Sequence, residues 1–251
     1  MGSNMPAVRN AAAVLRLLAS NSRPIPASAV ARHVGMPRSS TYQLLQVLID
    51  EGLVSHIPET HNYSLGVAAF ELGSAYLRKS PLEHLAQPIL ARLVAQTAQA
   101  AQLGILHGRE VLYLLKEQPP TPTTLVTGVG VRMPAHLTAS GRSMLALLPR
   151  QQLLALFPRR ESFVDRTGVG PTNLRELRAV LAGERERGWA VEEGAVSEGV
   201  TSIAAAAHEL SGRPAASIGI SFRAESVRPE DYPQLAAYVA GAASELSTRL
   251  R

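Results

Sequence analysis

A tight turn of three residues, Gly35-Met36-Pro37, constrains the front of this chain more than any other feature. Residues 27–34 (ASAVARHV) have the periodicity of a short helix before the turn, and another helix is predicted from the turn to about Glu51. Glycine readily adopts the left-handed conformation that such a turn needs, and proline suits the first turn of a helix. With a further helix predicted at residues 7–19, this region is expected to form a three-helix module that contains a helix–turn–helix.

The predicted core of this module is aliphatic, because apolar residues recur on one side of each helix. Ser39 or Ser40 is expected to cap the third helix. Two short strands, residues 53–57 and 62–66, follow and are joined by Pro58-Glu59-Thr60-His61, so the pattern predicts a wing beside the helices. The residues expected in the core are Val8, Ala12, Leu15, Leu18, Leu44, Leu45, Val47, Leu48 and Ile49.

The charge of this module is positive. The first acidic residue in the chain is Asp50, and five arginines precede it. A solvated helix face usually mixes both signs of charge, whereas a DNA phosphate backbone attracts a surface of one sign. The sequence therefore favours a DNA-binding module over a three-helix bundle with an ordinary wet face, and double-stranded DNA is the predicted partner.

In a helix–turn–helix the recognition helix enters the major groove with its N-terminal residues on base edges. Arginine can fork onto guanine and glutamine onto adenine, while hydroxyl groups suit phosphate oxygens. The wing can reach a phosphate or the minor groove through Thr60, His61 or Asn62. The predicted DNA-contacting residues are Arg9, Arg38, Ser39, Ser40, Tyr42, Gln43, Gln46 and His61.

The rest of the chain predicts a second, different domain. Residues 67–79 are helical and connect the two parts, and Ser80-Pro81 marks a boundary. Segments 102–107 and 110–116 indicate a hairpin around Gly108. Since strands do not alternate regularly with helices, an α+β fold with a mostly antiparallel sheet is favoured over a parallel doubly wound one. Residues 123–129 are expected to be extended and 200–209 mixed, and the predicted division is 5–66, 67–80 and 81–251.

Composition and missing motifs exclude several classes of protein. Without cysteine there are no disulfides, thiolate metal sites or cysteine nucleophile. No apolar run approaches the ~20 residues that span a bilayer, so a cytoplasmic protein with no membrane contact and no cofactor is expected. Gly128-x-Gly130 lacks the third glycine of a dinucleotide fingerprint, and Ala139-Ser140-Gly141 is not a nucleophile elbow. For His136, a structural hydrogen bond is favoured over a metal site with Glu192 or Glu193.

Two downstream stretches carry the small polar groups of a ligand site. In residues 128–146 a glycine-rich loop leads to a helix that opens at Thr138 to Ser140, and the uncovered backbone N–H groups of such a helix start suit a carboxylate. Residues 189–205 mix acids, glycines and hydroxyls between apolar residues, which is typical of a pocket with a few polar groups. A small organic acid is the expected ligand class.

Several short motifs occur in a fixed order and spacing along the chain. The front part has Gly35-Met36-Pro37-Arg38-Ser39-Ser40-Thr41-Tyr42, Gly52-Leu53-Val54 and Tyr63-Ser64-Leu65-Gly66. The rear part has residues 132–142 (RMPAHLTASGR), Glu192-Glu193, Glu198-Gly199-Val200, Ile203-Ala204-Ala205 and residues 215–221 (AASIGIS). With these motifs together, the chain resembles the IclR family of bacterial transcription regulators over essentially its full length.

The resemblance implies a winged helix–turn–helix joined by a linker helix to a GAF-like effector-binding domain, in a homodimer or a dimer of dimers. It implies a repressor or activator, not an enzyme, whose operator affinity responds to a small organic acid or aromatic metabolite. The N–H groups of Ala139 and Ser140 would hold the anionic end of this effector. The residues implied to contact it are Leu125, Met133, Ala139, Ser140, Glu192, Val200, Ser202, Gly219 and Ser221.

Three positions depart from the family pattern. Gln43 replaces a common arginine, Arg142 a common lysine and Ser202 a frequent cysteine. The operator sequence and the effector class therefore stay open. Helix 67–79 is open to two roles, a dimer contact or packing within its own module. The first alternative function is a DNA-binding protein that oligomerises without responding to a ligand, and an enzyme ranks behind it.

Overall fold

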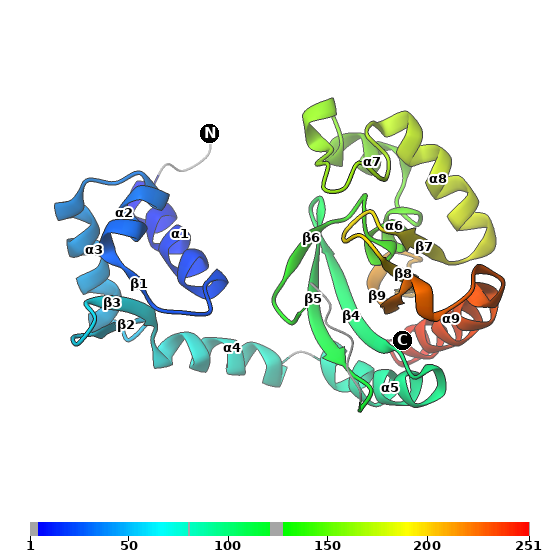
Figure 1. Cartoon of the computed structure of the whole chain (residues 1–251), viewed down its shortest axis with the longest axis horizontal. Helices are drawn as coiled ribbons and strands as arrows, with labels where there is room; N and C mark the ends of the chain where they lie inside the picture. The colour runs from blue at the N-terminus through cyan, green and yellow to red at the C-terminus, as the bar shows by residue number, and fades with distance from the viewer. Residues whose placement is uncertain (1–4, 80, 121–127, 251) are drawn as a thin grey trace. The chain divides into compact units, whose positions relative to one another are not determined.

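The computed structural model describes residues 5–79, 81–120 and 128–250, and the chain forms two compact units, residues 1–80 and 81–251 (Figure 1). A separate segment at 67–80 stays a prediction. Within the described ranges, no helix is long and apolar enough to cross a membrane.

The first unit is a three-helix module with a small antiparallel sheet and one further helix. Its strands pair in the order β1-β3-β2, so the predicted wing is present between β2 and β3. The helices are α1 (Pro6–Ser20), α2 (Ala27–Val34), α3 (Arg38–Asp50) and α4 (Val67–Lys79). The strands are β1 (Ile25–Pro26), β2 (Val54–Ile57) and β3 (Asn62–Leu65).

The turn between α2 and α3 has the predicted geometry. Gly35 has φ 71°, and its N–H donates to the Ala31 carbonyl at 2.9 Å. The expected cap at Ser39 or Ser40 is wrong, because Pro37 precedes the first helical residue and Thr41 Oγ1 donates back to the Pro37 carbonyl at 3.0 Å. The helix thus begins two or three residues earlier than a cap at Ser39 or Ser40 would allow.

Most of the predicted core residues of the first unit lie in or against its core, but Val8 and Val47 do not. Val14 and Leu18 of α1 are buried, whereas Val8 is 60% exposed. On α3, residues Thr41, Leu45 and Leu48 form the buried stripe. Val47 lies about 100° around the helix from Leu48 and is 55% exposed, so its predicted place in the core is wrong.

The second unit has a six-stranded antiparallel sheet in the order β6-β5-β4-β9-β8-β7, which confirms the α+β class. The predicted hairpin is β4–β5, closed at Gly108 with φ 64°. Of the strand expected at 123–129, residues 123–127 lie outside the described residues, while Gly128 is in no strand and Val129 lies in a turn. Residues 200–208 form one continuous strand. The strands are β4 (Ala100–His107), β5 (Glu110–Glu117), β6 (Arg132–Pro134), β7 (Ala190–Glu193), β8 (Val200–His208) and β9 (Pro214–Arg223).

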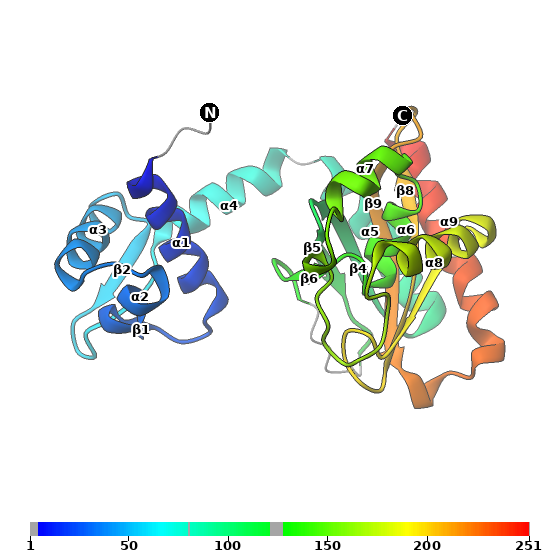
Figure 2. The same ribbon diagram turned by 90° about the horizontal axis from the view of Figure 1, so that it is seen from above.

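Helices cover both faces of this sheet (Figures 1 and 2). The larger core lies between one face and helices α5 and α9, and the second core lies between the other face and helices α6 to α8. The helices are α5 (Pro81–Thr97), α6 (Ala139–Leu145), α7 (Arg150–Leu156), α8 (Leu174–Arg187) and α9 (Tyr232–Arg249). Three 3₁₀ turns occur at η1 (Arg160–Ser162), η2 (Ala224–Ser226) and η3 (Pro229–Asp231).

Helix α6 is buried along its whole length. The helix opens within the predicted Thr138 to Ser140, and Thr138 caps it, its Oγ1 accepting from the Gly141 N–H at 2.9 Å. The segment before the helix passes so close that a Cβ at Gly141 would lie 2.2 Å from the Ala135 carbonyl oxygen. This contact brings the start of α6 against its own entry loop.

Arg142 of α6 is a buried cation that joins three segments. Its Nε donates to Glu184 of α8 at 2.9 Å, and its Nη1 donates to the Leu137 carbonyl at 3.2 Å. Its Nη2 donates to the Val191 carbonyl of β7. Arg142 and Glu184 are only 5% and 3% exposed, so neither charge has water as an alternative partner.

We expect Gly141→Ala to destabilise the second unit by roughly 1–3 kcal/mol, because the new methyl group collides with backbone that cannot move independently. Urea unfolding of the full chain measures this. The matched control is Gly183→Ala at an exposed position of α8. Nothing lies within 4 Å of the added methyl group there, and alanine favours a helix over glycine, so this variant should gain stability. Equal effects of the two substitutions would refute the close contact.

Candidate functional site

The polar residues predicted to contact DNA lie on an exposed side of the first unit. Arg9, Arg38, Ser39, Tyr42, Gln43, Gln46 and His61 are exposed, and Ser40 is half-buried. Arg38, Tyr42 and His61 line one hollow of about 260 Å³ beside the start of α2, so the wing tip and the recognition helix meet there. Gln46 already has one hydrogen-bond partner within α3, since its Nε2 donates to Asp50 Oδ1 at 2.8 Å.

Ser28 is a surface residue that the sequence did not single out. It lines the hollow of Arg38 and His61 and also a second hollow of about 440 Å³ beside the α2–α3 turn. It lies in the first turn of α2, where backbone N–H groups point outward and favour an anion. Its hydroxyl is suited to a phosphate oxygen, but only the fold brings it next to α3.

In the second unit, polar side chains form a hydrogen-bonded row across the sheet face that α6 covers. Gln102 Nε2 on β4 donates to Ser221 Oγ on β9 at 2.9 Å. Ser221 Oγ lies 2.9 Å from Ser202 Oγ on β8, and Ser202 in turn hydrogen-bonds Glu192 on β7. With Tyr113 and Ser140, which hydrogen-bond each other, these residues are called the polar cluster below.

The cluster forms because antiparallel register aligns its members. Glu192 pairs with Ser202, and Ser202 pairs with Ser221. Gly219 leaves room for the helix above it, since a Cβ there would lie 3.2 Å from Ser140 Oγ and 3.1 Å from the Ala204 Cβ. The start of α6 therefore lies directly over β9.

The structure brings most of the predicted effector residues together. Ser140, Glu192, Ser202, Gly219 and Ser221 lie in or against the polar cluster. Ala139 packs with Ala190 and Ala204, Met133 is buried in the core that contains Tyr113, and Val200 is half-buried at the start of β8. Leu125 lies outside the described residues.

Two members of the cluster were missed by the sequence reasoning. Gln102 is 3% exposed and Tyr113 is 4% exposed, although both lie in strands that otherwise consist mostly of apolar residues. A polar residue in an apolar strand is a weak signal, because strand alternation alone does not show which strand lies beside it.

Burial controls the protonation of the cluster. It raises the pKa of the Glu192 carboxyl, although the Val196 N–H donates to Glu192 Oε1 at 3.1 Å. Burial also raises the pKa of Tyr113 to about 12, so its phenol stays neutral at pH 7. The cluster can thus donate hydrogen bonds from hydroxyl and amide groups and accept them at Glu192.

His136 has a structural role. Its Nε2 lies 3.0 Å from the Val164 carbonyl, and its ring contacts those of Phe157 and Phe163 edge-on. Burial lowers its pKa, so the neutral ring is favoured. Among the described residues, no group of three histidine or acidic side chains is arranged to hold a metal ion.

Comparison with known proteins matches both units to the same family. The model of the IclR helix-turn-helix domain matches residues 7–58, and that of the bacterial transcriptional regulator IclR C-terminal domain matches residues 74–248. The glycerol operon regulatory protein of Streptomyces coelicolor is 31% identical over the whole chain and 98% of its own length. The transcriptional repressor IclR of Escherichia coli is 25% identical over 93% of this chain and 86% of its own.

Solved structures share the fold. An IclR transcriptional regulator from Alicyclobacillus acidocaldarius has a TM-score of 0.85 at 22% identity, covering 99% of this chain and all of its own. An IclR homolog from Microbacterium hydrocarbonoxydans, complexed with 4-hydroxybenzoate, has a TM-score of 0.82 at 21% identity and covers 98% of this chain and 99% of its own.

We expect Glu192→Gln to become progressively more stable than the wild type as the pH rises above 4.5, the ordinary pKa of glutamate. A pKa that is raised in the folded state means that the ionised carboxylate of Glu192 opposes folding. The stability that the protonated Glu192 contributes is therefore fully present below pH 4.5 and is lost as the pH rises through the raised pKa. The gain should grow as the pH passes through the raised pKa and then level off. Urea unfolding across a pH series measures it, with Glu193→Gln on the exposed side of β7 as control. A difference independent of pH would contradict the assignment.

Proposed function

The chain belongs to the IclR family of bacterial DNA-binding transcriptional regulators, and we propose that a small organic acid bound at the polar cluster changes its affinity for an operator. The observation that carries this proposal is the continuous row of Gln102, Ser221, Ser202 and Glu192 beneath the start of α6. Core packing alone does not require a row of buried hydrogen-bonding groups, whereas recognition of a polar ligand does.

The ligand we propose has an anionic end, an apolar body and a second polar end. By helix geometry, the N–H groups of Ala139 and Ser140 have no acceptor within α6, and they are available to a carboxylate. Glu192, Ser202 and Ser221 can meet a hydroxyl or similar group at the other end. The 4-hydroxybenzoate bound by the Microbacterium hydrocarbonoxydans homolog has this chemistry, which supports the class without identifying the ligand here.

For the first unit we propose that α3 enters the major groove. Arg38, Gln43 and Gln46 would face base edges, while Ser39, Ser40 and Tyr42 contact phosphate or sugar. Arg9 and His61 would add contacts at the flanks, and Ser28 joins them through its place beside Arg38. The hollow that Arg38, Tyr42 and His61 share supports this surface.

We further propose that α4 takes part in a homodimer or dimer of dimers. Val67, Phe70 and Leu72 are 66%, 74% and 65% exposed, so these apolar side chains are not packed within their own unit. A second copy would cover them and would also supply the second head that operators with two half-sites require. The ligand would then act by favouring one spacing of the two heads.

We expect Arg38→Ala to weaken operator binding by about tenfold or more. If Arg38 neutralises a phosphate, the slope of log affinity against log salt concentration should also fall by about one. If Arg38 reads a guanine, that slope should stay the same and the preference for the base at that position should relax. Fluorescence anisotropy with a promoter fragment from the protein's own locus measures both. Arg213→Ala, an exposed arginine on the β8–β9 turn, is the control. Unchanged binding by the Arg38 variant would remove it from the interface.

We expect Glu192→Ala to abolish the change in operator affinity that an organic acid causes, while operator binding without the acid persists. The probes are 4-hydroxybenzoate and related hydroxy acids at millimolar concentration. Glu193→Ala is the matched control, because Glu193 neighbours Glu192 but lies on the exposed side of the same strand. A full response in the Glu192 variant would refute the site, and no response of the wild type to any acid would favour a regulator that only oligomerises.

A further inference from the structure

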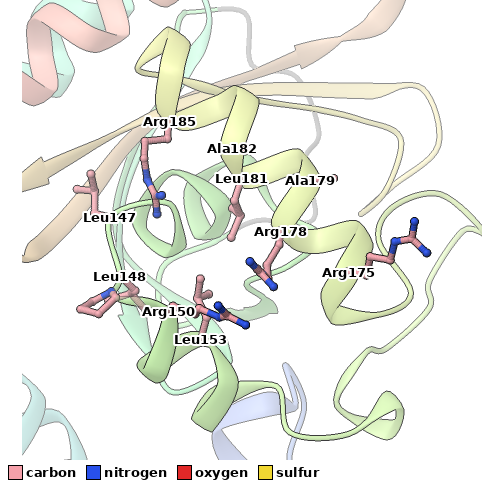
Figure 3. A pocket seen from close by; sticks show the side chains of 11 residues that line it. Leu147, Leu148, Arg150, Leu153, Arg175, Arg178, Ala179, Leu181, Ala182 and Arg185 are labelled. Carbon is pink, nitrogen blue, oxygen red and sulfur yellow. The ribbon is translucent and has the colours of Figure 1, made fainter.

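A second concave site lies on the outer side of α8, away from the polar cluster. Helix α7 and the loop that follows α6 form one wall and α8 forms the other, and they enclose about 780 Å³ (Figure 3). Four arginines line it, Arg150, Arg175, Arg178 and Arg185, above a floor that includes Leu153 and Leu181. We call these six residues the arginine groove.

The described lining residues offer hydrogen-bond donors but no side-chain acceptor. Besides the four arginines they are only leucine, alanine and proline. Within the described part of the chain, none of the four guanidinium groups forms an ion pair with a carboxylate. Arg185 is anchored by its Nε, which donates to the Ala146 carbonyl at 2.6 Å, and its terminal nitrogens extend beyond that contact.

Two of these arginines do not serve the stability of α8. Arg175 and Arg178 lie near its N-terminus, where the helix dipole disfavours a cation, most strongly at Arg175 in the first turn. They are also three residues apart on the helix, a spacing at which like charges repel. In Figure 3 the side chains of Arg150 and Arg178 point toward one another from opposite walls, so the repulsion also crosses the groove.

An occupant must therefore supply negative charge to the rim and apolar surface to the floor. Leu153 and Leu181, at 5% and 2% exposed, close the groove from below, and Leu147 of the lining is 37% exposed and offers surface that an apolar body can cover. Guanidinium groups bind phosphate and carboxylate oxygens through two parallel hydrogen bonds. The volume of this open groove lies within the range of small-molecule sites.

We propose that the arginine groove binds a small amphipathic anion, an apolar body that ends in a doubly charged oxyanion such as a phosphate monoester. The oxyanion lies between Arg150 and Arg178, and the apolar body covers the exposed lining leucine, Leu147. This site is separate from the polar cluster and would make the regulator responsive to a second class of metabolite.

Calorimetric titration of the full chain with hexyl phosphate tests this. We expect saturable binding of one molecule per chain, at least about tenfold tighter than inorganic phosphate, which lacks the apolar body, and hexanol, which lacks the charge. Phthalate, an apolar body with two carboxylates, distinguishes a phosphate preference from a general preference for two negative charges. The double variant Arg150→Gln/Arg178→Gln should weaken hexyl phosphate by about tenfold or more.

Matched variants make the result specific. Arg159→Gln/Arg213→Gln removes the same charge from exposed positions outside the groove and should bind hexyl phosphate normally. Glu192→Ala should also bind it normally, since the polar cluster is a different site. The proposal is overturned if the wild type binds neither hexyl phosphate nor phthalate, if inorganic phosphate binds as tightly as hexyl phosphate, or if Glu192→Ala loses binding while the double variant keeps it.

Discussion

The second unit depends on one buried positive charge. Arg142 reaches the Leu137 carbonyl ahead of α6, the Val191 carbonyl on β7 and the Glu184 carboxylate on α8. Removing one partner of such a buried pair typically costs about 3–5 kcal/mol, so these segments are held together as a group. Ser140 lies two residues before this arginine and Glu192 directly follows Val191, and the same charge therefore fixes the spacing between the two sides of the polar cluster.

Much of the fold follows from local chemistry in the sequence. Gly35 and Gly108 mark turns that need a positive φ, and Thr138 caps α6 through its own hydroxyl, so these elements were predictable. The burial of single positions on a helix was harder to predict: Val47 lies between Leu44, Leu45, Leu48 and Ile49 in an apolar-rich stretch, yet it is exposed. Strand β8 was ambiguous for another reason: its run of four alanines has little strand preference, and only pairing with β7 and β9 makes it extended.

The sites divide in the same way. Recognition of motifs identified Ser140, Glu192, Ser202 and Ser221, and the structure joins three of them in one row. Gln102 belongs to that row only because β4 pairs with β9, which no local pattern in β4 reveals. The arginine groove is harder still to predict from the sequence. Arg150 and Arg178 come from different helices, and only the packing of these helices brings them to one opening.

The alanines of β8 have a consequence for how such a regulator diversifies. Ala204 lies beneath Ala139, and beside it Gly219 leaves just enough room for Ser140. The side chains of Ala139, Ala204 and Gly219 are at or near the minimum size, so a single added methyl group at one of these positions changes the clearance between helix and sheet. Descendants of this chain can therefore acquire new chemical preferences in steps of one carbon atom while the scaffold stays the same.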